Sequence, residues 1–174
     1  IGNLATRSVY GLTWPMDLGD PTSAAYMEVE NDYAESIYQT SGLDGLHVTV
    51  GHEFHHAIQF AYFASDLMWW HEATATAMEE VMYPEVDDYV QYVDSVLNFP
   101  TASLDHWPSF SDEHAYGASI FPLYLSTAYG ASAVRGTWEL LGNRRPGEYR
   151  LEDIDAGLPT GGFAEVLPGY VVWN

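Results

Sequence analysis

Two histidines one helical turn apart give the chain its clearest chemical signal. His52 and His56 lie in the run HEFHH, and Glu53 directly follows the first of them. Residues four apart share one face of an α-helix, so both imidazoles can bind the same ion. The carboxylate of Glu53 would lie beside that ion, where it can take a proton from a metal-activated water molecule and pass it to a leaving amine. The spacing predicts a zinc site that hydrolyses peptide bonds.

A catalytic zinc ion binds three protein ligands and keeps a fourth position for water, so a third ligand is required. The chain has no cysteine, which leaves histidine, aspartate and glutamate as the possible types. Glu72 in the run WWHEATA is one possible donor, and Asp112 and Glu113 in the run SDEHAYG are others. A short break at residues 65–66 can turn the helix that carries Glu72 back beside the histidines.

The run around Glu72 resembles the gluzincin metallopeptidases, in which a glutamate on the helix after the HExxH helix completes the zinc site. Their aminopeptidase branch carries Trp-x-x-Glu-Gly-x-Ala at this point. Trp69, Glu72 and Ala75 match that pattern, while Ala73 replaces the glycine. Fifteen residues separate His56 from Glu72, fewer than in the well-studied gluzincins. The resemblance implies Glu72 as a ligand, zinc as the cofactor and a protein or peptide as the substrate.

Three longer runs, HEFHHAIQF, WWHEATATAMEE and HAYGASIFPLYL, are similar to a group of secreted bacterial metalloproteases represented in myxobacteria. This resemblance covers about residues 24–130 and implies an extracellular location. The rival run SDEHAYG is similar to the aspzincin pattern Gly-Thr-x-Asp-x-x-Tyr-Gly. There Asp112 stands one residue too far from Tyr116, and Glu113 is the wrong residue type.

Peptide hydrolysis also needs a hydrogen-bond donor for the oxyanion of the tetrahedral intermediate. Tyr116 and His114 are the candidates, because the resemblance to gluzincins implies a tyrosine or histidine from downstream of the metal-binding helices. Glu79 and Glu80 have two interpretations, as charges on a solvated helix face or as partners that hydrogen-bond the metal ligands. No catalytic or metal-binding role is predicted for His47, His55, His71 and His106.

Helices must position these residues, and the pattern of apolar side chains predicts them. Apolar residues at helical spacing predict an active-site helix over residues 46–64. Good helix formers predict a glutamate helix over residues 68–82, which Pro84 ends. The tail is interpreted as a short helix between two turn-forming pairs, TGGF and LPGY. Further backing helices are predicted over residues 86–97, 117–128 and 131–141.

Upstream of the helices, alternation over residues 24–33 predicts an edge strand, and residues 1–23 are interpreted as loop with short extended pieces. The zincin resemblance implies that such an edge can bind a substrate peptide as an added strand. The predicted fold is an α+β zincin-like domain with a small twisted sheet, the HExxH helix, the glutamate helix and backing helices. At 174 residues one domain is expected, with a loop and edge-strand region at 1–45 and a mainly helical region at 46–174.

Composition limits the partners. The formal charge of -20 reflects 25 carboxylates against five arginines and no lysine. Nucleic acid and anionic membranes would repel such a chain, and no run reaches the length of a membrane span. The charge suits a secreted bacterial protein or a salty medium, and equally a simple need for solubility. A monomer is expected, and calcium is a second candidate ion, although no loop has the spacing of a calcium hand.

Two other functions are compatible with the same ligand types. One is a non-catalytic binding domain that keeps a structural metal on a zincin scaffold, and the other is a zinc hydrolase of non-peptide substrates. An intact Glu53 argues against the first, because a structural site needs no general base. The cleavage-site preference and the native substrate are not determined by these residues.

Overall fold

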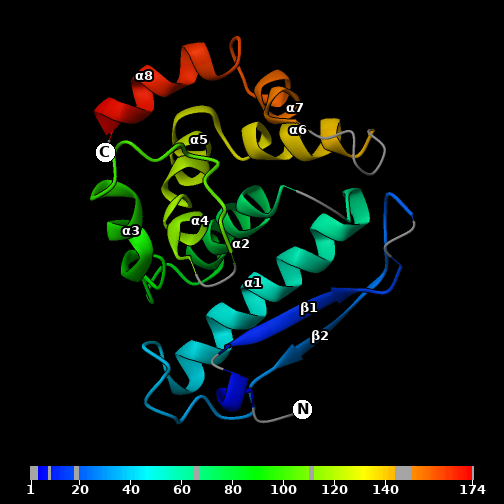
Figure 1. Ribbon diagram of the computed structural model, residues 1–174, viewed down its shortest axis with the longest axis vertical. Helices are drawn as coiled ribbons and strands as arrows, with labels where there is room; N and C mark the ends of the chain where they lie inside the picture. The colour runs from blue at the N-terminus through cyan, green and yellow to red at the C-terminus, as the bar shows by residue number, and fades with distance from the viewer. Residues whose placement is uncertain are drawn as a thin grey trace.

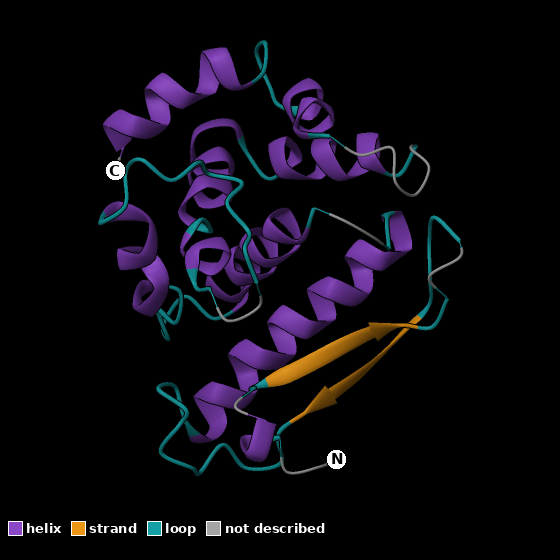
Figure 2. Ribbon diagram, in the orientation of Figure 1, coloured by secondary structure: helices purple, strands orange, loops and turns teal. Residues whose placement is uncertain are grey.

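The polypeptide has an α+β fold in which one long helix contacts both a β-hairpin and other helices (Figures 1 and 2). The computed structural model describes residues 4–7, 9–17, 20–64, 67–109, 112–143 and 150–173. A 3-10 turn at Ala5–Arg7 is followed by β1 (Gly11–Pro15) and β2 (Ala25–Val29). The helices are α1 (Gly42–Tyr62), α2 (Met68–Met82), α3 (Val90–Leu97), α4 (His114–Gly117), α5 (Ile120–Tyr129), α6 (Ser132–Leu141), α7 (Leu151–Gly157) and α8 (Phe163–Trp173).

Helix α1 contacts both the hairpin and α2 (Figure 1). It is amphipathic, and its buried face includes Val48, His52, His56 and Phe60, which recur at a spacing of four residues. The helix ends at Tyr62, where Phe63 adopts an extended conformation and donates its N–H to the carbonyl of Gln59. On this face, apolar Val48 and Phe60 therefore lie on either side of the two histidines, which are held in the interior.

Helix α2 has the predicted bounds and lies antiparallel to α1. Contacts between side chains give the direction, because His52 meets Glu79 whereas Gln59, two turns later, meets Thr74. The helix ends at Met82 because the residue before Pro84 is disfavoured in the helical conformation. Residues 65 and 66, the predicted break between the two helices, lie outside the described residues.

The hairpin packs along α1 through its first strand. β1 pairs antiparallel with β2, with Gly11 opposite Val29 and Pro15 opposite Ala25. The approach to α1 is close, since a Cβ on Gly11 would lie 2.6 Å from Thr49 Cγ2 and 2.7 Å from Glu53 Cγ. Only glycine leaves enough space at this position, so β1 lies directly over the middle of α1.

The C-terminal helices enclose α2 in the main hydrophobic core. Trp70 of α2 is fully buried, and its indole N–H donates to Thr137 Oγ1 of α6 at 3.0 Å. Phe121 of α5, Leu141 of α6 and Ile154 of α7 belong to the same buried cluster. Burying one such side chain contributes about 1.5–3 kcal/mol, so this core fixes the helix that carries Glu72. In the described part of the chain no helix has the length and apolar character of a membrane span.

Several predicted elements differ from the observed ones. The predicted strand at 24–33 is shorter, and its partner β1 lies in the region interpreted as loop with short extended pieces, where no strand was placed because the stretch lacks a clear period. The active-site helix begins at Gly42 instead of residue 46, and α3 begins at Val90 instead of residue 86. The single helix predicted at 117–128 is divided into α4 and α5, and α7 was not predicted.

The interpretation of LPGY as a turn is wrong, because these residues lie inside α8. Pro168 occupies the helix interior, a position that proline normally destabilises. Gly169 is required for packing, since a Cβ there would lie 2.1 Å from the hydroxyl of Tyr124 on α5. The glycine therefore allows α8 to approach α5, which a turn-based interpretation of Pro and Gly does not anticipate.

Gly11→Ala is expected to destabilise the fold by about 1–3 kcal/mol, because the added methyl group must push β1 away from α1. Gly51→Ala is the matched comparison, since Gly51 lies in the interior of α1 and a Cβ there meets its nearest atom, Met82 Sδ, at 3.5 Å. That substitution should stabilise the helix by up to about 1 kcal/mol. Urea denaturation of both variants measures the two effects, and equal stability of the two would contradict the close packing of β1.

Candidate metal centre

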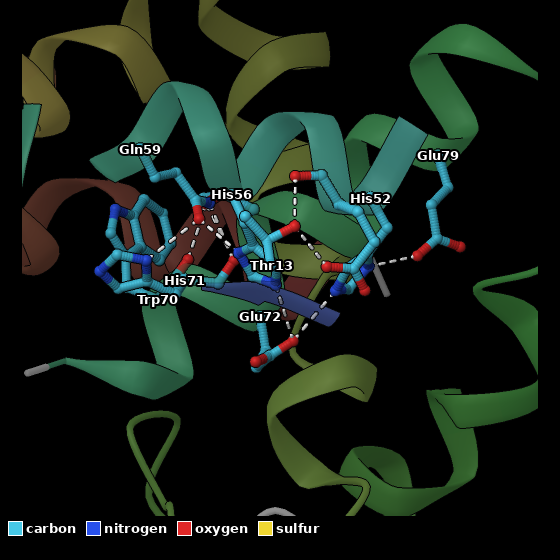
Figure 3. Close-up of polar contacts among 10 residues, drawn as sticks. Thr13, His52, His56, Gln59, Trp70, His71, Glu72 and Glu79 are labelled. Atoms are coloured by element: carbon cyan, nitrogen blue, oxygen red, sulfur yellow. Dashed lines mark hydrogen bonds and ion pairs between the residues drawn. The ribbon is translucent and has the colours of Figure 1, made fainter. Parts of the chain in front are cut away.

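Helices α1 and α2 bring three ligand-type side chains together. His52, His56 and Glu72 are all buried, and each offers one ligand atom within 4.8 Å of the others. Oε2 of Glu72 lies 3.1 Å from Nε2 of His52 and 3.4 Å from Nε2 of His56. Figure 3 shows both imidazoles directed from α1 toward this carboxylate on α2. This group could hold a metal ion.

The outward nitrogen of each imidazole has its own hydrogen-bond partner. Nδ1 of His52 lies 2.6 Å from Oε1 of Glu79, which comes from α2, two turns beyond Glu72. Nδ1 of His56 lies 2.6 Å from Oε1 of Gln59, one turn further along α1. Partners of this kind orient ligand imidazoles and select the tautomer with the proton on Nδ1. The inward Nε2 atoms are then left with lone pairs that point at Glu72.

The arrangement needs a proton or a metal ion between its acceptor atoms. Two imidazole lone pairs and a carboxylate oxygen are all acceptors, and acceptors within 3.4 Å repel one another unless a proton or a metal ion lies between them. Burial strengthens the requirement, because Glu72 is only 4% exposed and water cannot screen its charge. The donor set therefore fits a divalent ion bound by two nitrogens and one oxygen.

Burial and the close contacts among these histidines and glutamates also shift their pKa values. Burial by itself would lower the pKa of His52, but hydrogen bonds and attraction from Glu72 and Glu79 raise it well above its ordinary value. Burial would raise the pKa of Glu72, but the charge and hydrogen bonds of His56 and His52 hold it well below its usual range. Burial raises the pKa of Glu79 to about 8, against the opposing effect of His52. A positive charge between His52 and Glu72 is therefore stabilised by both neighbours.

Glu53 lies under the first strand of the hairpin. It is buried, and the hydroxyl of Thr13 in β1 lies 2.7 Å from its Oε2 and 2.9 Å from its backbone carbonyl. Its other carboxylate oxygen, Oε1, lies close to Gly11, where a Cβ would be 3.0 Å away. One oxygen is therefore held by the strand, and the glycine allows the strand to pass close to the other.

Tyr116 and His114, the two predicted oxyanion donors, have different surroundings. The ring of Tyr116 stacks on His52 with a centroid distance of 6.1 Å, and burial followed by the charges of Glu72, Glu53 and Glu79 raises its pKa well above the ordinary value. It therefore keeps its hydroxyl proton. The two ring nitrogens of His114 instead lie 3.2 and 3.0 Å from backbone carbonyl oxygens of α3 and the loop that follows it. The geometry favours Tyr116 over His114.

The alternative third ligands are not part of the metal-binding group. Asp112 accepts a hydrogen bond from the backbone N–H of His114 at 2.9 Å, and Glu113 is exposed. Among the described residues, His52, His56 and Glu72 are the only three ligand-type side chains whose ligand atoms all lie within 4.8 Å of one another. A second group of this kind, for calcium or another ion, is absent from the described part of the chain.

The sequence predicted no role for two residues near the site, Gln59 and Thr13. For Glu79 it predicted a role only as one of two interpretations. Glu79 is buried against His52, so the solvated interpretation of this residue is wrong and the alternative is confirmed. Gln59 stands three residues after His56, a spacing that could have indicated a partner on the same helix face. Thr13 gave no signal, because it lies in a stretch interpreted as loop.

Comparisons with protein-family models, with curated proteins and with solved structures find no match. The resemblance to gluzincins therefore stays a prediction from three short runs of sequence. Any functional conclusion depends on the geometry of His52, His56 and Glu72 and on the side chains that surround them.

Glu79→Ala is expected to weaken metal binding about 10- to 100-fold, because His52 loses the partner that orients it. Glu80→Ala is the matched control, since it removes the same charge from the neighbouring position, which is only partly buried. Competition with a chromogenic chelator measures both affinities. The same affinity in both variants would show that Glu79 does not support the site.

Metal binding is also expected to strengthen as pH rises. The raised pKa of His52 means that an incoming ion must displace a proton near neutral pH. The apparent affinity should fall by up to about tenfold for each unit that pH drops below that pKa. Isothermal titration calorimetry in two buffers of different ionisation enthalpy measures the released proton, and an affinity independent of pH would contradict the assignment of His52.

Proposed function

We propose that the protein is a zinc-dependent endopeptidase of gluzincin type. The observation that carries the proposal is the buried group of His52, His56 and Glu72, with Glu53 next to the first ligand in the chain. Two histidines and a glutamate are the ligand set of many catalytic zinc sites, which leave a fourth position open. The long active-site helix, the antiparallel glutamate helix and the flanking hairpin agree with the expected zincin-like arrangement.

The spacing of the ligand atoms supports zinc. Tetrahedral bonds of 2.0–2.1 Å place neighbouring ligand atoms about 3.3 Å apart. The distances from Oε2 of Glu72 to the two Nε2 atoms, 3.1 and 3.4 Å, lie on either side of that value. Iron and other first-row ions accept the same donors, so the metal content of the purified protein decides the identity of the ion.

A zinc ion bound to these residues would polarise a peptide carbonyl and lower the pKa of a water molecule toward neutrality. Glu53 then supplies the general base, because it directly follows His52 in the chain and the Thr13 hydroxyl fixes Oε2 of its carboxylate. The same carboxyl returns the proton to the amine nitrogen when the C–N bond breaks. Peptide hydrolysis by this route needs no covalent intermediate.

Tyr116 is proposed as the donor to the developing oxyanion. Its ring is held against His52, and its raised pKa keeps the phenolic O–H available near neutral pH. A preorganised donor of this kind contributes most when it meets charge that appears only in the transition state.

Glu53→Gln should keep the metal and lose the chemistry. The amide preserves the shape and can still accept the hydrogen bond from Thr13, but it cannot take a proton, so cleavage of casein should fall by roughly 10²- to 10⁴-fold. Glu113→Gln, at an exposed carboxylate, should leave the rate unchanged. Mass spectrometry of the products distinguishes internal cuts from trimming of the ends.

The outcomes separate the possible functions. Zinc binding without cleavage of peptides or esters would indicate a non-catalytic domain with a structural metal. Cleavage of esters alone would indicate a hydrolase of other substrates. Full activity in Glu53→Gln would exclude this residue as the base.

Tyr116→Phe should lower kcat by on the order of 10²-fold with little change in KM, because the hydroxyl acts only in the transition state. Tyr92→Phe is the matched control, since its ring lies 5.3 Å from that of Tyr116. An equal loss in both variants, or a rise in KM alone for Tyr116→Phe, would assign Tyr116 to packing or substrate binding instead.

A further inference from the structure

Gln59 has a complete set of hydrogen bonds in the interior. Its side chain is 1% exposed. Nε2 donates to the backbone carbonyl of His71 at 2.9 Å and to Thr74 Oγ1 at 2.8 Å. Oε1 lies 2.6 Å from Nδ1 of His56 and 3.0 Å from Nδ1 of His71. The two donor and two acceptor positions of the amide are therefore all used.

The orientation of this amide is determined by its surroundings. A backbone carbonyl can only accept, so the group that faces the carbonyl of His71 must be the NH₂ of Gln59. Thr74 agrees with this, because its hydroxyl donates to the carbonyl of Trp70 at 2.7 Å and so presents a lone pair to Gln59. A flipped amide would place two oxygens against each other. Oε1 therefore faces the two imidazoles.

The fixed amide selects the tautomer of both histidines. Because Oε1 only accepts, Nδ1 of His56 and Nδ1 of His71 must each carry the hydrogen. His71 is itself only 1% exposed, so its ring N–H needs an acceptor such as this one. For His56 the consequence is a bare Nε2, the atom that faces Glu72.

Three of these four bonds, those to His71 and Thr74, connect the two helices that carry the metal ligands. Gln59 belongs to α1, whereas His71 and Thr74 belong to α2 and lie on either side of Glu72 in sequence. The amide therefore joins the helices one turn away from His56 and directly beside the glutamate. An apolar side chain of similar size would fill the space but would select no tautomer.

We propose that Gln59 is a positioning residue that holds His56 in its metal-binding tautomer and fixes the spacing between that histidine and Glu72. This role depends on the metal site proposed above, but not on peptide cleavage. His52 is held by a carboxylate and His56 by a neutral amide, so the two ligands have different supports. His71, for which the sequence predicted no role, shares the amide without binding the ion.

The test compares Gln59→Met with the wild type by two readouts. In metal-free wild type, imidazole ¹⁵N spectra should show His56 and His71 protonated at Nδ1. In Gln59→Met the Nε2-protonated form of His56 should appear, and zinc affinity measured by chelator competition should fall about 10- to 100-fold. Gln39→Met, at an exposed glutamine, is the matched control and should change neither readout.

Two further variants keep the inference testable if Gln59→Met does not fold. Thr74→Val preserves the shape but removes one acceptor of the Gln59 amide, so it should weaken zinc binding by a smaller factor. His71→Phe removes only the second donor to Oε1, keeps the backbone carbonyl that orients the amide, and should leave zinc affinity unchanged.

If Gln59→Met folds, wild-type zinc affinity together with an unchanged His56 tautomer would overturn the inference. If Gln59→Met does not fold, full zinc affinity in Thr74→Val would overturn it. A loss in His71→Phe as large as that in Thr74→Val would also overturn it. A wild type that binds zinc but cleaves no peptide would contradict the proposed activity and leave the role of Gln59 supported.

Discussion

The buried carboxylate of Glu72 between two imidazoles is the interaction on which the rest of the structure depends. A charge at 4% exposure is costly unless it is paired, and His52 and His56 lie 3.1 and 3.4 Å from this carboxylate. Its position explains why α2 must return antiparallel to α1 at close range. It also explains why the pKa of His52 is raised although burial alone would lower it.

The supports of the site come from separate parts of the chain. β1 holds Glu53 through Thr13, α2 supplies Glu79 behind His52, and α4 places Tyr116 against the same imidazole. The aromatic core around Trp70 fixes α2 from the opposite side. A site assembled from β1, the α1–α2 pair and α4 depends on the whole fold. A change at Gly11, which lies against Glu53, can therefore reach the chemistry.

The ligands could be predicted because their spacing is local, whereas their supports depend on tertiary contacts. His52 and His56 lie four residues apart on one helix face, and Pro84 ends α2 at the predicted place. β1 was predicted only as an unplaced extended piece, because Gly11 is required by Thr49 and Glu53 on α1, and LPGY was taken as a turn because Gly169 is required by Tyr124. Thr13 has no local signature and Glu79 only an ambiguous one, since each is defined by the atom that it meets on α1, whereas the spacing of Gln59 from His56 is local. The comparison with known proteins leaves the family of the chain as a prediction.

The most direct test of the account is the metal content of the purified protein, measured by mass spectrometry after dialysis, for the wild type and for Glu72→Gln. The amide keeps the size of Glu72 and removes the negative charge that the cation requires. The account predicts about one zinc ion per wild-type chain and a large loss of zinc in the variant, with the fold retained. A wild type without metal, or a variant that keeps the same zinc content and affinity, would contradict the assignment of His52, His56 and Glu72 as the metal centre.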